Sequence, residues 1–183
     1  MRVGIVGYGW VGKAMHQLFP DAYIYTKSIG TKEKVNECEI VFIGVPTPNR
    51  HKRCEDFKCF HTKDDKNCAI YGEGQLDISI VESIIEWCKA DLIVIRSTVN
   101  PGDCDRWTEK YKKHIIMQPE YLGETPNHPL LDPKTRPFLI IGGEKEDRRK
   151  LIDLYTTVYN ANIIIKQVNL LEAEIIKLSE NRA

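Results

Sequence analysis

The chain has 183 residues, which is enough for one domain with a buried core. Hydrophobic residues make up 42% of it and charged residues 28%, as in an ordinary soluble globular protein. The 26 Lys and Arg residues balance 26 Asp and Glu residues, so no net charge attracts nucleic acid or an acidic membrane. The composition therefore predicts a globular protein that binds neither nucleic acid nor membrane.

The sequence shows no targeting or membrane segment. Its first residues, MRVGIVGYGW, lack the long apolar run and small-residue cleavage site of a signal peptide. No apolar stretch approaches the roughly 20 residues of a membrane helix. The six cysteines are scattered, which without a secretory signal favours reduced thiols. We expect a cytoplasmic protein.

Short β-branched runs alternate with longer amphipathic runs along the chain. The predicted strands are Arg2–Val6, Tyr23–Tyr25, Ile40–Val45, Leu92–Arg96, His114–Met117, Phe138–Ile141 and Ile163–Lys166. The predicted helices are Val11–Phe19, Ile80–Lys89, Cys104–Lys113, Lys145–Tyr159 and Val168–Asn181. Several strands are almost wholly apolar, as parallel strands covered on both faces are. We predict an α/β fold, a Rossmann-type doubly wound, mostly parallel sheet with helices on both faces.

One helix start carries a local signal. Ser79 followed by Glu82 fits a capping box, in which each side chain bonds the backbone N–H of the other residue. This pair predicts that Ser79 lies just before the first helical residue.

The first strand runs directly into a glycine motif, Gly7-x-Gly9-x-x-Gly12, that opens a helix. Gly7 permits the tight turn, Gly9 lets a pyrophosphate approach the backbone, and Gly12 lets helix and strand pack closely. The helix N-terminus then offers N–H groups and a positive dipole end to the phosphates. The motif predicts dinucleotide binding through Gly7, Gly9, Trp10, Val11 and Gly12.

The end of the second strand lacks the acid that usually accompanies such a motif about 20 residues on. Thr26 stands in that place, followed by Lys27 and Ser28, while Asp21 comes too early. Lys27 and Ser28 could accept a 2′-phosphate, which would favour NADP. Alternatively, this is a weakened NAD site with ordinary surface residues.

Residues 50–73, RHKRCEDFKCFHTKDDKNCAIYGE, form a long, charged and cysteine-rich insertion. Cys54, Cys59, His61 and Cys68 could ligate Zn²⁺, but they lack the CxxC pair of common zinc sites, so a solvated loop of reduced cysteines is favoured. Its basic start, residues 50–53, could bind a phosphate or be a solvated run of charge.

Further motifs follow the glycine loop in a fixed order. They read VFIGVPTP (41–48), GQLDISIVESI (74–84), VIRSTVNPGD (94–103), QPEYLGE (118–124), LLDPKTRPFLIIGG (130–143) and EAEIIKLSEN (172–181). In these motifs the sequence resembles the UDP-glucose/GDP-mannose dehydrogenase family, specifically its N-terminal NAD-binding domain. The resemblance spans essentially the whole chain apart from residues 50–73.

The resemblance implies an activity and a set of site residues. Family enzymes oxidise the C6 hydroxyl of a nucleotide sugar twice, to the acid, using two NAD molecules and a covalent thiohemiester on a cysteine. NAD is thus the expected cofactor, with NADP not excluded, and a nucleotide sugar the expected substrate. The implied cofactor residues are Thr47 and Thr98, with Val45 and Pro46 of the VPTP motif; Thr26 and Lys27 at the end of the second strand complete the predicted cofactor residues. The implied catalytic residues are Thr98, Glu120, Glu124, Lys177 and Asn181.

This set suits the chemistry, because an oxidised alcohol must lose a proton beside a base or water relay and a cationic stabiliser. Gly123 stands where the family commonly has Arg. Each residue also has a purely structural interpretation: Thr98 as a local turn residue, Glu120 as a loop carboxylate, and Lys177 as an i,i+3 partner of Glu174.

The resemblance also divides the chain. Residues 1–166 correspond to the Rossmann dinucleotide-binding domain with its insertion, and residues 167–183 to the start of the family's central helix. In the family, that helix continues into a dimer-forming core, a GGxC-type loop supplies the nucleophilic cysteine, and a second domain holds the nucleoside. The sequence contains none of these, so we do not expect this chain alone to complete both oxidation steps.

Two hypotheses follow. The first is a dinucleotide-binding domain of an oxidoreductase that acts on nucleotide sugars. The second is a catalytically inactive module that sequesters a nucleotide, or pairs with another chain or a second copy through the C-terminal helix. The apolar stripe of Leu171, Ile175 and Leu178 would serve such pairing if it is exposed.

Overall fold

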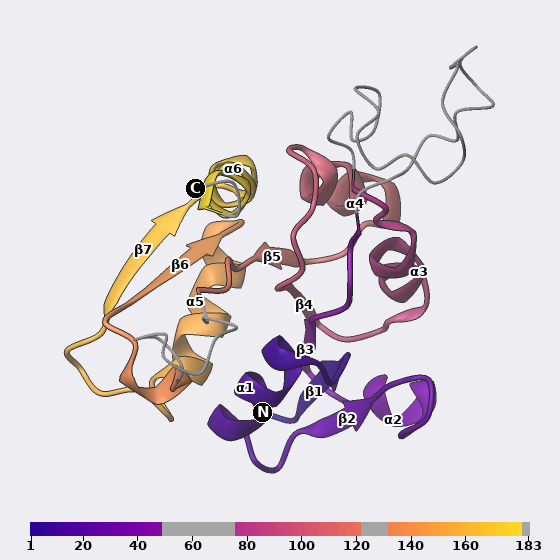
Figure 1. The fold of residues 1–183 in the computed structure, drawn as a ribbon, viewed down its shortest axis with the longest axis horizontal. Helices are drawn as coiled ribbons and strands as arrows, with labels where there is room; N and C mark the ends of the chain where they lie inside the picture. The colour runs from indigo at the N-terminus through magenta and orange to yellow at the C-terminus, as the bar shows by residue number, and fades with distance from the viewer. Residues whose placement is uncertain (49–75, 122–131, 181–183) are drawn as a thin grey trace, which may run out of the picture.

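The computed structural model describes residues 1–48, 76–121 and 132–180. A single sheet has seven strands in the order β2-β1-β3-β4-β5-β6-β7 (Figure 1). The strands are β1 (Val3–Val6), β2 (Tyr23–Tyr25), β3 (Ile40–Ile43), β4 (Leu92–Ile95), β5 (Ile115–Met117), β6 (Phe138–Gly142) and β7 (Ile164–Val168). The helices are α1 (Trp10–Leu18), α2 (Lys32–Val35), α3 (Ser79–Trp87), α4 (Asp103–Tyr111), α5 (Lys145–Tyr155) and α6 (Leu170–Glu180), with a 3₁₀ turn η2 (Pro133–Thr135).

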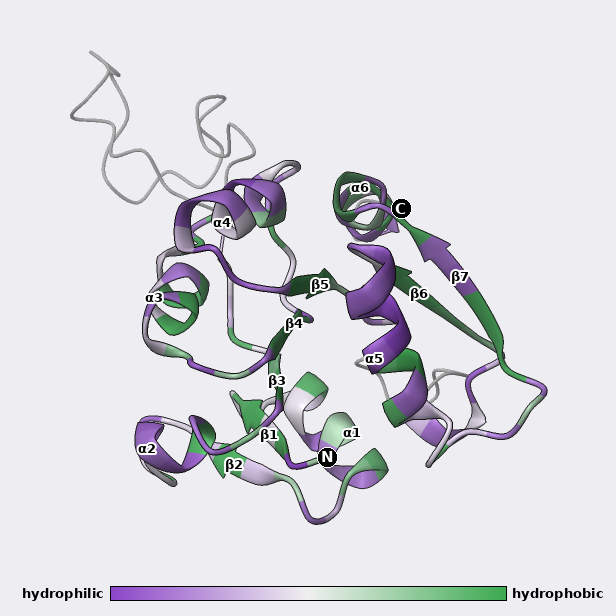
Figure 2. Ribbon diagram, turned by 180° about the vertical axis from the view of Figure 1, so that it is seen from behind, coloured by the Kyte–Doolittle hydropathy of each residue, from purple (hydrophilic) through white to green (hydrophobic). Residues whose placement is uncertain are grey.

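Helices cover both faces of the sheet, which confirms the predicted Rossmann-type fold. Neighbouring strand residues face opposite sides, so Ile43 packs with Trp107 of α4 while Phe42 packs with Met15 of α1 and Leu151 of α5. The wholly buried strands β1, β3, β4 and β5 are among the most apolar parts of the ribbon, whereas β7 is largely exposed and partly polar (Figure 2). Burial on both faces explains why these four strands read as continuous apolar runs in the sequence. Within the described ranges, no helix is long and apolar enough to cross a membrane.

The sheet changes direction once. All neighbouring strands are parallel except β5 and β6, which are antiparallel and share one register pair, Met117 with Gly142. Beyond this junction β6 and β7 form their own parallel unit with α5 as the crossover. In Figure 1 the β6–β7 unit lies to one side of β5 and the strands β1 to β4 to the other.

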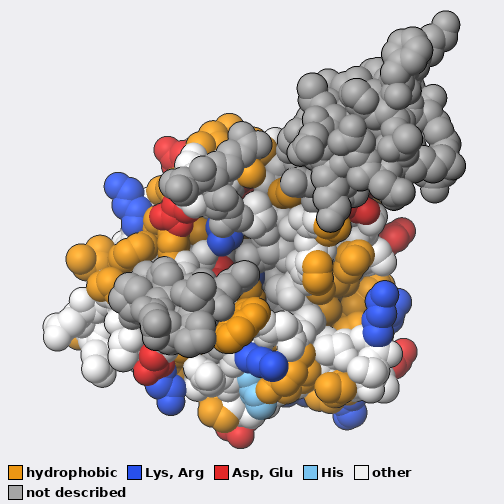
Figure 3. Space-filling model, viewed as in Figure 1, with side chains coloured by type: hydrophobic (Ala, Val, Ile, Leu, Met, Phe, Trp, Pro, Cys, Tyr) orange, Lys and Arg blue, Asp and Glu red, His pale blue; other side chains and the backbone are white. Residues whose placement is uncertain are grey.

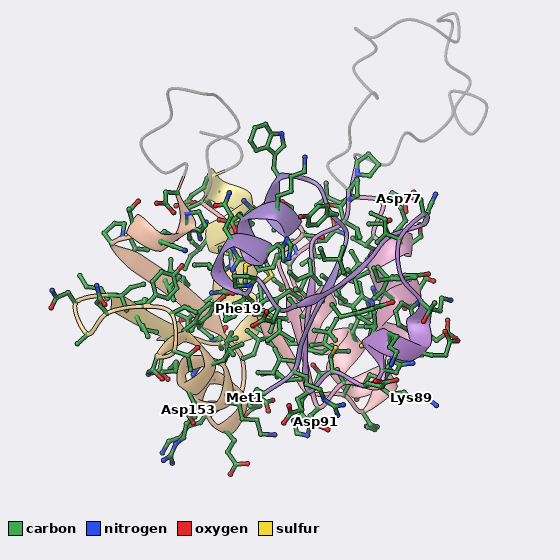
Figure 4. All side chains as sticks on the ribbon, turned by 90° about the horizontal axis from the view of Figure 1, so that it is seen from below. Met1, Phe19, Asp77, Lys89, Asp91 and Asp153 are labelled. Carbon is green, nitrogen blue, oxygen red and sulfur yellow. The ribbon has the colours of Figure 1, made fainter. Side chains whose placement is uncertain are left out.

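The two ends of the strands lie on opposite sides of the molecule (Figure 4). Met1 and Asp91 precede β1 and β4 and lie on one side, whereas Asp77, in the segment between β3 and α3, lies on the other. The carboxyl ends of the parallel strands β1 to β5 therefore lie together on the Asp77 side. Ligands of doubly wound sheets bind at the carboxyl ends of the strands, where the strand order reverses.

The predicted capping box at Ser79 is wrong. Ser79 is already the first helical residue of α3, and its N–H donates to Asp77 Oδ1 over 3.1 Å. Glu82 instead pairs with Lys110 of α4 at 2.9 Å. The side chains that form a box are Asn169 and Glu172 at the start of α6, each accepting from the other's backbone N–H, over 2.8 and 2.9 Å.

Glu174 fastens α6 to α4. Its buried carboxylate accepts hydrogen bonds from the backbone N–H of Gly102 at 2.6 Å and of Cys104 at 2.7 Å. These donors belong to the first turn of α4, where N–H groups have no partner within the helix. Burial raises the pKa of Glu174, although these hydrogen bonds oppose the rise. The anion thus neutralises a helix end at the cost of its own desolvation.

We predict that Glu174→Ala lowers the free energy of unfolding by about 2–4 kcal/mol, because the buried N–H of Cys104 and the partly buried N–H of Gly102 lose their acceptor. Urea denaturation at neutral pH measures this. Exposed Glu109 of α4 provides the control, and Glu109→Ala should change stability by less than about 0.5 kcal/mol. Equal effects of the two substitutions would contradict the assigned role.

The raised pKa of Glu174 also predicts a pH dependence. Glu174 binds a proton more tightly in the folded state than in the unfolded chain. The stability that this protonation adds is complete below pH 4.5 and is lost as pH rises through the folded pKa. Glu174→Gln cannot titrate. We expect the stability of the wild type relative to this variant to decrease as pH rises above 4.5, which denaturation at a series of pH values would show. A constant difference would count against a raised pKa.

Candidate nucleotide-binding site

The glycine loop between β1 and α1 is built as the motif predicts. Gly7 has φ 94° and its N–H donates to Tyr25 O over 2.9 Å, which joins the loop to the end of β2. A Cβ on Gly7 would collide with Gly44 O, and one on Gly12 would collide with Gly7 O. A Cβ on Gly9, however, would meet no atom within 4 Å. The first and third glycines therefore serve the protein's own packing, and the second faces open space.

That open space belongs to a cavity of about 430 Å³. It lies at the carboxyl ends of β1, β3, β4 and β5, beside the point where the order β2-β1-β3 reverses. Its lining residues come from the glycine loop and from the segments after these strands: Gly7, Tyr8, Gly9, Trp10, Val11, Gly44, Val45, Pro46, Thr47, Arg96, Ser97, Thr98, Glu120 and Lys177. Segments distant in sequence thus meet around one space.

Most residues predicted for a cofactor or for catalysis line this cavity. They are Gly7, Gly9, Trp10, Val11, Val45, Pro46, Thr47, Thr98, Glu120 and Lys177. Gly12 lies below the loop and packs against it. Thr26 and Lys27 lie outside the lining, in the turn after β2. The roles of these residues in binding or catalysis stay predictions.

The remaining predicted site residues fall outside the described parts of the chain. They are Glu124, Asn181 and the weak zinc candidates Cys54, Cys59, His61 and Cys68. Among the residues that the structure does describe, no group of three or more His, Cys, Asp and Glu side chains could hold a metal ion.

A buried ionic cluster supports the floor of the cavity. The carboxylate of Glu120 pairs with the guanidinium groups of both Arg96 and Arg136, and each of the three side chains is at most 4% exposed. Arg96 follows β4 directly, Glu120 follows β5, and Arg136 precedes β6. Burial lowers the pKa of Arg96 to about 10 and also lowers that of Arg136, yet both stay cationic near neutral pH. Charges this deeply buried need such partners.

Two neutral groups extend the cluster. Gln118 Oε1 accepts from Arg96 Nη1 at 2.5 Å and from the Tyr155 hydroxyl at 2.6 Å. Tyr155 comes from the end of α5, and burial raises its pKa, so it remains a donor. The cluster therefore joins β4, β5 and α5 behind the cavity.

Hydrogen bonds also fix the cavity walls. The Ser97 hydroxyl donates to Val45 O at 2.7 Å and accepts from Val45 N–H at 2.9 Å, which joins the segments after β3 and β4. Lys177 Nζ of α6 donates to Glu120 O at 2.5 Å. Since Glu174 meanwhile caps α4, Glu174 and Lys177 use different partners rather than forming the simple pair that their spacing allows.

Sequence reasoning missed Arg96, Ser97, Gln118 and Arg136. A usable signal existed for Arg96, because a charged residue closes the otherwise apolar run Leu92–Arg96 at a carboxyl strand end. Arg136 carried no such signal, since its partner Glu120 lies 16 residues away.

Charged side chains of both signs lie on one face of the molecule. On the face shown in Figure 3, basic and acidic side chains are interspersed rather than gathered by sign. This distribution agrees with the balanced composition, and the described residues form no extended basic surface on that face.

Three solved structures share this fold. GDP-mannose dehydrogenase from Pseudomonas aeruginosa is 19% identical with a TM-score of 0.67, and the match covers 100% of this chain and 49% of that one. UDP-glucose dehydrogenase from Pyrobaculum islandicum is 18% identical with a TM-score of 0.70, covering 98% and 49%. UDP-D-ManNAc dehydrogenase from Pyrococcus horikoshii is 17% identical with a TM-score of 0.71, covering 99% and 50%.

The chain thus spans about half the length of these enzymes. No curated protein sequence matches it. The model of the UDP-glucose/GDP-mannose dehydrogenase family, NAD binding domain, matches residues 20–161. Because that match covers well over half of the chain, the protein belongs to the UDP-glucose/GDP-mannose dehydrogenase family, in its NAD-binding domain.

Proposed function

We propose that the cavity binds a nicotinamide adenine dinucleotide, NAD or NADP, as part of an oxidoreductase acting on a nucleotide sugar. The observation that carries this proposal is the open side of Gly9, which faces the cavity at the reversal of strand order. A dinucleotide fits the residues present, because no protein atom lies within 4 Å of a Cβ position on Gly9 and a pyrophosphate could therefore approach the backbone there.

The phosphate end of the ligand would lie on the glycine loop. Helix α1 begins at Trp10 and has no acidic residue in its first turn. Its first N–H groups and the positive end of its dipole are therefore suited to an anion. Gly7, Gly9 and Val11 would hold the pyrophosphate through the backbone.

The nicotinamide end would lie near Thr98, Glu120 and Lys177, which share the cavity with the glycine loop. A bound nicotinamide supplies a hydride acceptor for alcohol oxidation. The ammonium group of Lys177, held by Glu120 O, would stabilise negative charge on the substrate oxygen as its proton leaves. Glu120, fixed by Arg96 and Arg136, would orient this group rather than move freely.

Nucleotide-sugar oxidation is the part of the proposal that draws on the family. The three solved enzymes are named for GDP-mannose, UDP-glucose and UDP-D-ManNAc, and this chain matches half of each. We therefore assign the chain the cofactor half of such a site, with Thr98, Glu120, Glu124, Lys177 and Asn181 as its catalytic candidates. A cytoplasmic setting suits the free cysteines Cys38, Cys88 and Cys104.

A second candidate function is pairing through α6, either between two copies of the chain or with another chain. Leu171 and Ile175 are 42% and 47% exposed, and Leu178 is half-buried. An apolar stripe of this kind on a helix commonly marks an interface. Such a module would need no catalysis.

The dinucleotide site is tested by calorimetry with NAD⁺, NADH, NADP⁺ and NADPH and by the variant Gly9→Ala. We expect micromolar binding of at least one cofactor and a loss of affinity of about tenfold or more in the variant, because the added methyl group occupies the pyrophosphate position. The melting temperature should change little, since this methyl group meets no protein atom within 4 Å.

Gly12→Ala is the matched control, because its methyl group would strike Gly7 O and should lower both stability and binding. Equal affinity of Gly9→Ala and wild type for every cofactor would refute the proposed site.

Pairing through α6 is tested by sedimentation velocity over a wide concentration range. We expect concentration-dependent dimers that Ile175→Glu abolishes, because a charge would then stand in the apolar stripe. Ile80→Glu, which also replaces an exposed isoleucine (42%) but on α3, should leave dimers intact. A monomer at every concentration would remove self-pairing.

A further inference from the structure

The turn after β2 lies where a dinucleotide's adenosine ribose would reach, so this inference rests on the proposed function. β2 pairs with β1 in parallel, and Tyr25 O at its end accepts from Gly7 N–H. Thr26 therefore stands directly beside the glycine loop. In doubly wound dinucleotide sites, an acid at this place accepts from the ribose 2′-hydroxyl of NAD, whereas a basic residue accommodates the 2′-phosphate of NADP.

The Thr26 side chain has no acceptor capacity left for a ribose hydroxyl. Its Oγ1 accepts from the backbone N–H of Ser28 at 3.2 Å and of Ile29 at 3.1 Å. A hydroxyl oxygen offers two lone pairs and one proton, so both lone pairs are used and only the proton remains. Thr26 N–H donates in turn to Ile29 O over 2.8 Å, which closes the turn.

The rest of the turn offers donors. Ser28 Oγ lies 3.3 Å from Thr26 Oγ1. Because both lone pairs of Thr26 are taken, Thr26 donates its hydroxyl proton to Ser28 Oγ, and the proton of Ser28 can point outward. Lys27 is exposed and contributes an ammonium group with three donors. Donors of this kind suit an anion rich in acceptor oxygens, such as a phosphate.

Neighbouring acids are committed elsewhere. Asp21 precedes β2 and lines a different cavity together with Met1, on the side of the sheet where the amino ends of β1 to β5 lie (Figure 4). Glu33 lies in the first turn of α2, where hydrogen bonds from its own backbone N–H and from Thr31 lower the pKa of its carboxyl group. Neither residue stands at the end of β2, where the acid is expected.

We propose that the Lys27 ammonium group and the Ser28 hydroxyl form a subsite for a phosphate group on the 2′ oxygen of adenosine ribose. The protein then binds NADP(H) in preference to NAD(H). The sequence left two alternatives open, a site for a 2′-phosphate and a weakened NAD site. The hydroxyl oxygen of Thr26 already accepts two hydrogen bonds, which favours the first alternative.

Calorimetry tests the subsite with two pairs of probes, NADP⁺ against NAD⁺ and adenosine 2′,5′-bisphosphate against 5′-ADP. The second pair reports on the adenosine end without the nicotinamide. We expect the 2′-phosphorylated member of each pair to bind about tenfold tighter or more, with a preference that weakens as salt concentration rises.

Substitutions sharpen the test. Lys27→Ala should remove most of the preference by weakening NADP⁺ while leaving NAD⁺ unchanged, and Lys166→Ala on β7, also exposed, should change neither. Thr26→Asp should reverse the preference, because a carboxylate can cap the turn and still accept from the ribose.

The outcomes separate this inference from the proposed function. NAD⁺ binding as tightly as NADP⁺, or a preference that survives Lys27→Ala, would overturn the subsite and leave the dinucleotide site standing. Absence of binding by all of the probes would overturn both.

Discussion

The carboxylate of Glu120, buried between Arg96 and Arg136, is the interaction on which the arrangement of the sheet and its cavity depends. β5 and β6 share only one register pair, so backbone pairing alone defines their relation weakly. The two arginines come from opposite sides of that junction, after β4 and before β6. Because removing Glu120 would leave two buried guanidinium groups without this counter-ion, the ion pairs hold the β6–β7 unit against the strands that form the cavity.

This junction also determines where α6 places its side chains. The helix starts directly after β7, and its Lys177 reaches Glu120 O while its Glu174 caps α4. Residues three apart lie on one helix face, so both contacts hold the same face against the domain. Leu171 and Ile175 take part in neither contact and remain exposed. Docking of α6 through Glu174 and Lys177 therefore leaves part of its apolar stripe uncovered.

The fold was predictable from the sequence because its signals are local. Apolar runs gave the strands to within one or two residues at most ends, and Gly7 and Gly12 are required by backbone contacts within the loop itself. The cluster around Glu120 was not predictable, because it depends on which loops the folded sheet brings together. The predicted capping box at Ser79 was wrong because its residue pattern also occurs one residue inside a helix, as in α3. The helix that does begin with a capping box is α6, at Asn169.

The glycine loop at the cavity and the turn after β2 are encoded differently, and this difference decides what a family resemblance can transfer. At the phosphate end, binding depends on backbone N–H groups and on glycines that admit no side chain, so ancestry and chemistry agree. At the ribose, recognition depends on whether one side-chain oxygen still has a lone pair to offer. In Thr26 the adjoining turn takes both lone pairs, so at the proposed subsite the fold's own hydrogen bonding, rather than inheritance, would set the preferred charge of the ligand.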